Sequence, residues 1–165
     1  MTRTSTILRL VAALLCLILV FGAGWVAGKM GIGAAADVSS LTERERMFAE
    51  QLKASSLVGR FTLDGREDRQ AVPDRYDISS VEKLDGDRWR FNVRMRYGSI
   101  DATLPVVLPL TWVGDTPMIN ITDFSIPTLG TFTVRLFFHD DRYAGIWENP
   151  KIGGHMFGRI EKSTD

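Results

Sequence analysis

The sequence predicts a mainly β protein: an N-terminal transmembrane helix, a short second helix, and an approximately eight-stranded antiparallel meander. Three observations lead to this prediction. An uncharged apolar run of nineteen residues occupies Leu10–Gly28. Ser40 and Glu43 then match the S-x-x-E pattern that begins helices. From Leu57 onward apolar and polar residues alternate with a period of two between recurring turn residues, which is typical of strands.

The apolar run is long enough to cross a bilayer, because about 20 residues of helix span a hydrocarbon core of ~30 Å. We therefore expect residues 1–30 to bind a membrane, through residues 10–28. Two interpretations stay open, a retained signal anchor and a cleaved signal peptide. Small residues at 34–36 offer a cleavage site, whereas apolar character continuing through Trp25–Ala27 favours the anchor.

The charges around this run predict the orientation. Arg3 and Arg9 precede it and only Lys29 follows closely, which favours a cytoplasmic N-terminus and a periplasmic or extracellular C-terminal domain. The chain has 20 basic and 20 acidic residues, and residues 1–36 hold three basic and no acidic ones. The exported part is therefore mildly acidic, which argues against a nucleic-acid partner. Cys16 is the single cysteine, so no intrachain disulfide can form.

Residues 31–56 are predicted to form a small-residue linker and a short helix over 41–55. The apolar stripe of this helix, made of Leu41, Phe48 and Leu52, is expected to pack on the β domain as a stalk or lid. The charged positions are expected to face water: Glu43, Arg44, Glu45, Arg46, Glu50 and Lys53.

Residues 57–165 are predicted to form the β domain. The expected strands are 57–64, 74–83, 88–97, 102–113, 118–124, 131–139, 142–148 and 155–161. The short connections imply antiparallel neighbours, because parallel neighbours need crossovers of a dozen residues or more. A small barrel, lipocalin-like in shape, and a curved sandwich both remain open. Eight strands is the number at which a small barrel interior is just filled.

The turn Asp85–Gly86 predicts the pairing of the second and third strands. As a two-residue hairpin loop it sets Asp77 opposite Arg94 and Ser79 opposite Asn92. Tyr76, Ile78 and Val93 then share the opposite face. One side of the hairpin is therefore expected to be core and the other polar.

A four-residue loop over Gly98–Asp101 would extend this apolar face by placing Met95 opposite Leu104. The same strand carries Pro105 and Pro109, whose missing N–H groups lie on one lateral side because they are four residues apart. We therefore expect an edge, a bulge or a weak seam there.

Four arginines alternate with apolar residues in the third strand: Arg88, Arg90, Arg94 and Arg96. This row would suit an acidic polymer or a phosphate. The interpretation we favour is a solvated outer face, with arginine stems covering apolar surface and one cross-strand pair to Asp77.

Several segments together resemble a family of uncharacterised planctomycete-type bacterial proteins, which look like single-span or secreted proteins with one small β domain. The segments are Leu57–Thr62, Gly114–Pro117, Asp123–Pro127, Gly130–Phe132, Asp141–Trp147 and Gly153–Gly158. The resemblance covers roughly residues 41–162. It implies a bacterial exported protein attached to the cell membrane, and it implies no activity or site.

The sequence holds no catalytic or cofactor signature, so the leading functional hypothesis is a non-enzymatic domain that binds a small apolar ligand or an envelope protein. No cofactor is predicted. The candidate ligand-binding residues are the aromatic ones expected in the interior: Trp89, Phe91, Trp112, Phe132, Phe138 and Trp147, with Tyr143 as an alternative to Trp147.

Two other functions stay open. The domain would be a purely structural scaffold if its interior is filled. It would be a hydrolase or isomerase if His139 acts together with Asp140 or Asp141. His139 and His155 are the only histidines and have no metal-ligand spacing, so no metal site is predicted.

Overall fold

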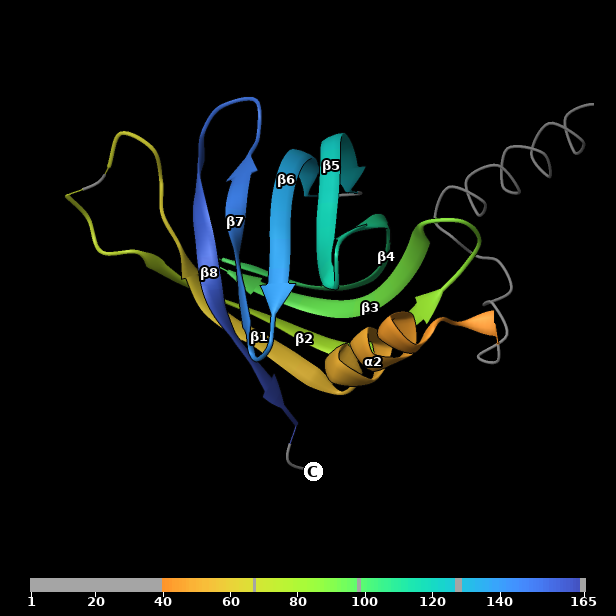
Figure 1. Cartoon of the computed structure of the whole chain (residues 1–165). Coiled ribbons are helices and arrows are strands. Elements are labelled where there is room, and N and C mark those ends of the chain that lie inside the picture. The colour runs from red at the N-terminus through yellow and green to blue at the C-terminus, as the bar shows by residue number, and fades with distance from the viewer. Residues whose placement is uncertain (1–39, 67, 98, 127–128, 164–165) are drawn as a thin grey trace, which may run out of the picture. The chain divides into compact units, whose positions relative to one another are not determined.

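The computed structural model describes residues 40–66, 68–97, 99–126 and 129–163 (Figure 1). This part of the chain consists of one α-helix followed by eight strands. They are α2 (Glu43–Leu52), β1 (Ser55–Phe61), β2 (Val72–Lys83), β3 (Arg88–Tyr97), β4 (Ile100–Val113), β5 (Thr116–Ile126), β6 (Gly130–His139), β7 (Arg142–Glu148) and β8 (Gly153–Lys162). The strands pair in chain order and β8 returns to β1, so the sheet is a closed barrel.

This architecture confirms the predicted antiparallel eight-stranded meander and decides between barrel and sandwich. The predicted anchor or signal peptide, residues 1–30, lies outside the described residues. Among the residues that are described, no helix is both long and apolar enough to cross a membrane.

The pairing of β1 with β8 closes the barrel. Seven consecutive residue pairs join the two strands, from Ser55 opposite Lys162 to Phe61 opposite Met156. Gly59 lies opposite Gly158 in the middle of this ladder. Because side chains alternate between the faces of a strand, Leu57 and Phe61 point into the barrel.

The start of α2 differs from the prediction. The capping box is formed by Thr42 and Glu45, each two residues after its predicted counterpart, Ser40 and Glu43. The Thr42 N–H donates to Glu45 Oε2 over 2.8 Å. The helix ends at Leu52, short of the predicted end at residue 55, because Ala54 has a left-handed backbone (φ 48°) and β1 begins at the next residue.

Glu45 does not face water as predicted. Its carboxylate accepts from Lys83 Nζ at 2.6 Å, and the residue is buried between helix and barrel. Burial acts to raise the pKa of Glu45, but the ammonium of Lys83 and the hydrogen bonds from Thr42 outweigh it and hold the pKa below its usual value. The predicted polar face of α2 therefore contains one buried ion pair that joins the helix to β2.

The helix closes one end of the barrel with an aromatic side chain. Phe48 packs edge-on against Trp89, Trp112 and Phe138, with ring centroids 5.9, 6.0 and 5.5 Å away. These three rings come from β3, β4 and β6, so one side chain contacts widely separated parts of the wall. The predicted packing of the helix on the β domain is thereby confirmed (Figure 1).

Backbone carbonyls at the same end hold the helix. Arg44 donates to the carbonyl of Gly114 between β4 and β5 at 3.1 Å, and Gln51 donates to that of Asp140 between β6 and β7. Lys162 at the end of β8 donates to the carbonyl of Lys53 at 2.9 Å. In an antiparallel meander these connections lie at one end of the barrel, which α2 covers.

The β2–β3 ladder confirms one predicted pair and corrects another. Asp77 lies opposite Arg94 as expected. Asn92 lies opposite Ser80, however, and not opposite Ser79. The register shifts between Ile78 and Ser80, which makes Ser79 the extra residue of a β-bulge.

The bulge compensates for a turn that is one residue longer than predicted. The N–H of Leu84 donates to the carbonyl of Arg88 at 2.8 Å, so the loop is Asp85–Asp87. Gly86 within it has a positive φ of 58°, which glycine adopts without steric cost. The longer loop and the extra residue at 79 cancel, and the predicted register survives beyond the bulge.

The β3–β4 register also differs by two residues. Met95 pairs with Ala102 and not with Leu104, because β4 begins at Ile100. A shift of two keeps every side chain on the predicted face of the sheet.

The predicted weak seam lies between β4 and β5. Their described pairing covers only Leu110–Val113 with Thr116–Ile119. The N–H of Leu110 donates toward the β3 side, to the carbonyl of Asp87, at 2.8 Å. Backbone nitrogens alternate sides along a strand, so those of Pro105 and Pro109 face the β5 side. The missing N–H groups thus coincide with the missing ladder.

We predict that Phe48→Ala lowers the free energy of unfolding by about 3 to 5 kcal/mol, because it empties the space between three aromatic rings. Phe48 is 3% exposed and its helix neighbour Met47 is 60% exposed. Met47→Ala should therefore change stability by less than about 0.5 kcal/mol. Urea denaturation of both variants measures the difference, and equal effects would contradict the role of Phe48.

Candidate functional site: an apolar cavity inside the barrel

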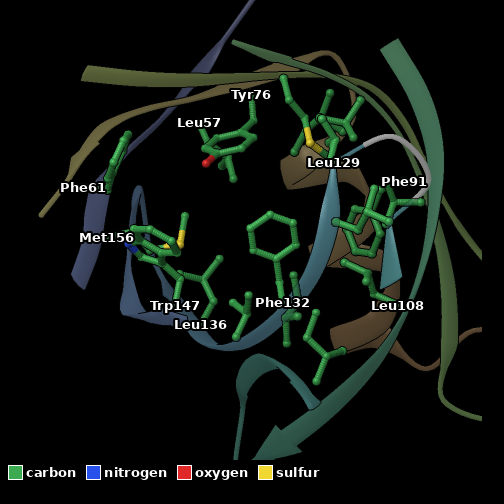
Figure 2. Close-up of a pocket in the computed structure, with 18 of the residues that line it drawn as sticks. Leu57, Phe61, Tyr76, Phe91, Leu108, Leu129, Phe132, Leu136, Trp147 and Met156 are labelled. Atoms are coloured by element: carbon green, nitrogen blue, oxygen red, sulfur yellow. The ribbon is translucent and has the colours of Figure 1, made fainter. Parts of the chain in front are cut away.

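The interior of the barrel contains a cavity of about 430 Å³. Its walls come from every strand and from the last residue of α2 (Figure 2). The lining residues are Leu52, Leu57, Phe61, Tyr76, Ile78, Phe91, Val93, Met95, Ile100, Val106, Leu108, Ile119, Ile121, Ile126, Leu129, Phe132, Val134, Leu136, Phe138, Trp147, Asn149 and Met156. None of these side chains carries a charge.

The cavity extends away from the end that α2 covers. Ile100, Ile126, Leu129 and Asn149 line it, and they lie at the connections β3–β4, β5–β6 and β7–β8. These connections form the opposite end of the meander. In the described part of the chain, no helix covers that end.

The predicted interior aromatics divide into two groups. Phe91, Phe132, Phe138 and Trp147 line the cavity. Trp89 and Trp112 do not line it and pack against Phe48 under the helix. Phe138 does both. Figure 2 shows the ring of Phe132 in the middle of the space, with Tyr76 on another wall. Other lining residues were not predicted as site residues, among them Leu57, Phe61, Tyr76, Leu136 and Met156.

Three lining residues carry polar atoms. Asn149 Oδ1 accepts from the N–H groups of Lys151 and Ile152 at 2.9 and 3.1 Å, so it stabilises the β7–β8 turn. Trp147 packs edge-on against Phe61, with centroids 5.6 Å apart. The Nε1 of Trp147 is buried and has no hydrogen-bond partner among the described residues. The third is Tyr76.

Tyr76 connects the cavity wall to a buried carboxyl group that the sequence analysis missed. Asp74 is 4% exposed and accepts hydrogen bonds from Tyr76 and from Tyr143, whose hydroxyl is 3.4 Å from Oδ1. Its Oδ2 has no hydrogen-bond partner within the described part of the chain. A signal for this position existed, since Asp74 precedes Tyr76 and Ile78 by two and four residues and so shares their inward face.

Burial raises the pKa of Asp74 to about 6, and the two tyrosine hydroxyls only partly oppose this rise. Burial also raises the pKa of Tyr143, and the neighbouring charge of Asp74 adds to the effect. The phenol therefore stays protonated and acts as a hydrogen-bond donor to the carboxyl group.

Two glycines make room for this polar cluster. A Cβ at Gly59 would collide with the hydroxyl of Tyr143 and the carbonyl of Phe157, and one at Gly158 would meet the same hydroxyl and the backbone of β1. Since Gly59 and Gly158 face each other across the β1–β8 ladder, they leave space over which the Tyr143 side chain reaches Asp74. The closing ladder and the buried carboxyl group thus depend on the same pair of glycines.

The residues proposed for an enzyme do not line the cavity. His139 is 72% exposed, with Nε2 3.6 Å from Asp140 Oδ2. Asp141 forms ion pairs with Arg159 and Arg142 on the surface. Among the described residues, no group of three or more His, Cys, Asp or Glu side chains could hold a metal ion.

Carboxylates pair with all four arginines of the row, where the solvated-face interpretation predicted one cross-strand pair, to Asp77. The four ion pairs are Arg88–Asp85, Arg90–Glu82 (2.9 Å), Arg94–Asp101 (2.7 Å) and Arg96–Asp77. Asp77 thus pairs with Arg96, although Arg94 lies directly opposite it in the ladder. These contacts leave the row poorly suited to bind an anionic polymer.

Comparisons of the chain with models of protein families, with curated proteins and with solved structures found no match. The resemblance to planctomycete-type proteins therefore stays a prediction.

We predict that Asp74→Asn removes a pH-dependent loss of stability. Because the pKa of Asp74 is about 6 in the fold and its ordinary value, expected in the unfolded chain, is 3.8, protonated Asp74 favours the fold, and this contribution is lost as the pH rises from about 4 through 6. The free energy of unfolding of Asp74→Asn, relative to that of the wild type, should rise by about 1 to 3 kcal/mol between pH 4 and pH 7.5, after allowance for solvent screening.

Asp77→Asn on the same strand is the matched control. Burial acts to raise the pKa of Asp77, but Ser56, Arg75 and Arg96 together hold it below its usual value. Its stabilising contribution is therefore present at neutral pH and lost in acid, the opposite sign. Urea titrations at several pH values compare the variants, and an Asp74→Asn difference that does not change with pH would contradict the assignment.

Proposed function

We propose that this chain is a membrane-anchored cell-envelope protein whose exported, non-enzymatic barrel binds one small apolar ligand in its interior. The observation that carries the proposal is the 430 Å³ cavity with its uncharged, almost wholly apolar wall. Ligand sites have volumes of roughly 300 to 1,000 Å³ and are lined mainly by apolar side chains. Each Å² of apolar surface buried there contributes about 25 cal/mol.

A retained cavity also favours binding over a purely structural role. Interiors normally pack densely, and an unfilled space loses contacts at its whole lining. Eight-stranded barrels occur both with filled interiors and with one bound ligand. The described interior is dense at the α2 end and hollow beyond it, which supports a ligand site.

The alternative, a module that binds a protein partner, is favoured by apolar side chains on the outer face of β6–β8. Phe137 and Phe157 flank Ala144 in adjacent strands, and both are more than two-fifths exposed. Such a patch is typical of an interaction surface.

We further propose that residues 10–28 attach the barrel to the membrane of a bacterial cell, with the barrel on the periplasmic or extracellular side. This rests on the apolar run and its flanking charges. Alkaline phosphatase fused after Asp165 should be active in the periplasm. An inactive fusion, with an active cytoplasmic reporter at the same site, would show the opposite orientation.

Native mass spectrometry of the full-length chain purified from its own host tests the ligand. We expect one small apolar molecule per chain in the wild type and its loss in Val134→Phe, because the larger ring fills part of the cavity. Val113→Phe is the control, since Val113 is 66% exposed on β4, and it should keep the ligand.

The stability of Val134→Phe should be close to that of the wild type, because the new ring enters empty space and strains little of the core. A wild type that carries no small molecule, or a Val134→Phe variant that keeps it, would contradict the proposal. A co-purifying protein in place of a small molecule would support the partner-binding alternative.

A further inference from the structure

We propose that the outer face of β6–β8 binds the surface of an anionic lipid bilayer, through exposed apolar side chains that arginines surround. The inference goes beyond the ligand cavity, and it rests on the proposed function only for the membrane anchor at residues 10–28. Two features of this face carry it. Its apolar side chains are exposed next to one another, and its guanidinium groups outnumber the carboxylates beside them.

The apolar patch consists of Phe137, Ala144, Ile146 and Phe157. Its three large side chains are 42%, 50% and 46% exposed in chain order. Phe137 and Phe157 lie opposite Ala144 on its two sides, and Ile146 follows Ala144 by two residues on the same face. Neighbouring strands are about 4.8 Å apart, so roughly 10 Å separates the backbones that carry the two rings. A continuous patch of this kind marks an interaction surface, whereas single exposed apolar side chains do not.

Arginines surround the apolar patch. Its nearest neighbours are the side chains directly opposite in the ladders and those two residues along the same strand, because these share its face. Four of them are arginines, one each on β1, β6, β7 and β8: Arg60, Arg135, Arg142 and Arg159. Glu148 is the single carboxylate among these described neighbours, and His139 and His155 add charge only when protonated.

Few carboxylates pair with these arginines. Arg142 and Arg159 share one, Asp141 in the β6–β7 turn, with Arg142 Nε 3.7 Å from Oδ1. Arg60 and Arg135 donate to backbone carbonyls instead. In the described part of the chain, neither of these two has a carboxylate partner.

The apolar patch therefore lies in positive surroundings on an acidic domain. Glu148 and Asp141 set two negative charges against four guanidinium groups, which leaves a net charge of +2. The next carboxylate on β8 is Glu161, two residues beyond Arg159. Residues 37–165 as a whole hold 17 basic and 20 acidic residues, a net charge of −3. Positive charge is thus concentrated around the exposed apolar side chains.

An anionic bilayer matches this combination. Apolar side chains of a bound face enter the boundary between headgroups and acyl chains, and guanidinium groups form paired hydrogen bonds with phosphates. A second copy of the chain matches it less well. A two-fold interface places a patch against itself and would set arginines against arginines.

The bilayer is also a partner that the proposed anchor keeps within reach. Residues 29–42 join the proposed span to α2, and a chain of this length extends at most about 50 Å. The ten residues of β8 extend about 33 Å, so the tether is long enough for this face to contact lipid. Tethering raises the effective concentration of the bilayer, and a few contacts then suffice for binding.

The test holds the full-length chain in lipid nanodiscs of phosphatidylcholine with one-quarter phosphatidylglycerol, some of whose headgroups carry gadolinium. Methyl NMR measures the relaxation that gadolinium adds at Ile146 in the patch and at Val113, which is 66% exposed on β4. We expect the added relaxation to be at least fivefold greater at Ile146. Equal values would overturn the inference and leave the patch to a protein partner.

Lipid composition tests the charge. In discs of phosphatidylcholine alone, the ratio of Ile146 to Val113 should fall below twofold, because the arginines lose their anionic partners. The same ratio in both kinds of disc would overturn the requirement for an anionic bilayer.

Two variants test the placement. Phe157→Ser removes one of the exposed rings, and the ratio should fall below twofold. Met47→Ser is the matched control, since Met47 is 60% exposed on α2 outside the patch, and the fivefold ratio should remain. If Phe157→Ser does not fold, Arg60→Gln replaces it and should lower the ratio at least twofold. A full ratio in the variant used would contradict the placement.

The discs also separate this inference from the proposed anchor. A chain that stays with the discs while Ile146 and Val113 relax equally keeps its anchor, and only the binding face is wrong. A chain that leaves the discs overturns both, because neither the span nor the face then holds it. The ligand in the cavity is tested independently by mass spectrometry.

Discussion

The ladder between β1 and β8 is the constraint on which the rest of the domain depends. Its seven residue pairs turn an open meander into a barrel and remove the two edges that a free sheet would expose to other chains. Closure also creates an inside, toward which the alternating apolar residues of all eight strands point. The facing glycines at 59 and 158 allow Tyr143 to reach Asp74 across this ladder, so the closing contact also shapes the interior.

The helix then divides that interior into a filled part and a hollow part. Phe48 packs against the rings of Trp89, Trp112 and Phe138 and forms one aromatic cluster with them. The ion pair of Glu45 with Lys83 holds the helix against β2. The large side chains gathered at this end are not available to fill the other end. The apolar cavity and its polar group at Tyr76 therefore follow from the way the aromatic residues are distributed, and this distribution is the basis of the proposed ligand binding.

The strands were predictable because the apolar period of two and the turn residues are local signals. The errors occurred where local patterns were ambiguous: the three-residue turn over Asp85–Asp87, the bulge at Ser79, and a capping box two residues after the predicted one. Closure of β1 on β8 joins strands a hundred residues apart, so no local pattern could decide between barrel and sandwich. Whether six interior aromatics fill the barrel depends on side-chain packing, and it could not be read from composition.

Xenon is the most direct test of the central claim that the barrel holds an apolar cavity beyond its helical end. Xenon enters apolar cavities and needs no polar contact, so its binding does not depend on the nature of the natural ligand. In crystals of the protein pressurised with xenon, the account predicts density among Phe132, Leu136 and Met156, and none between Phe48 and the rings beneath it. A barrel in which side chains occupy this space and no xenon binds would contradict it.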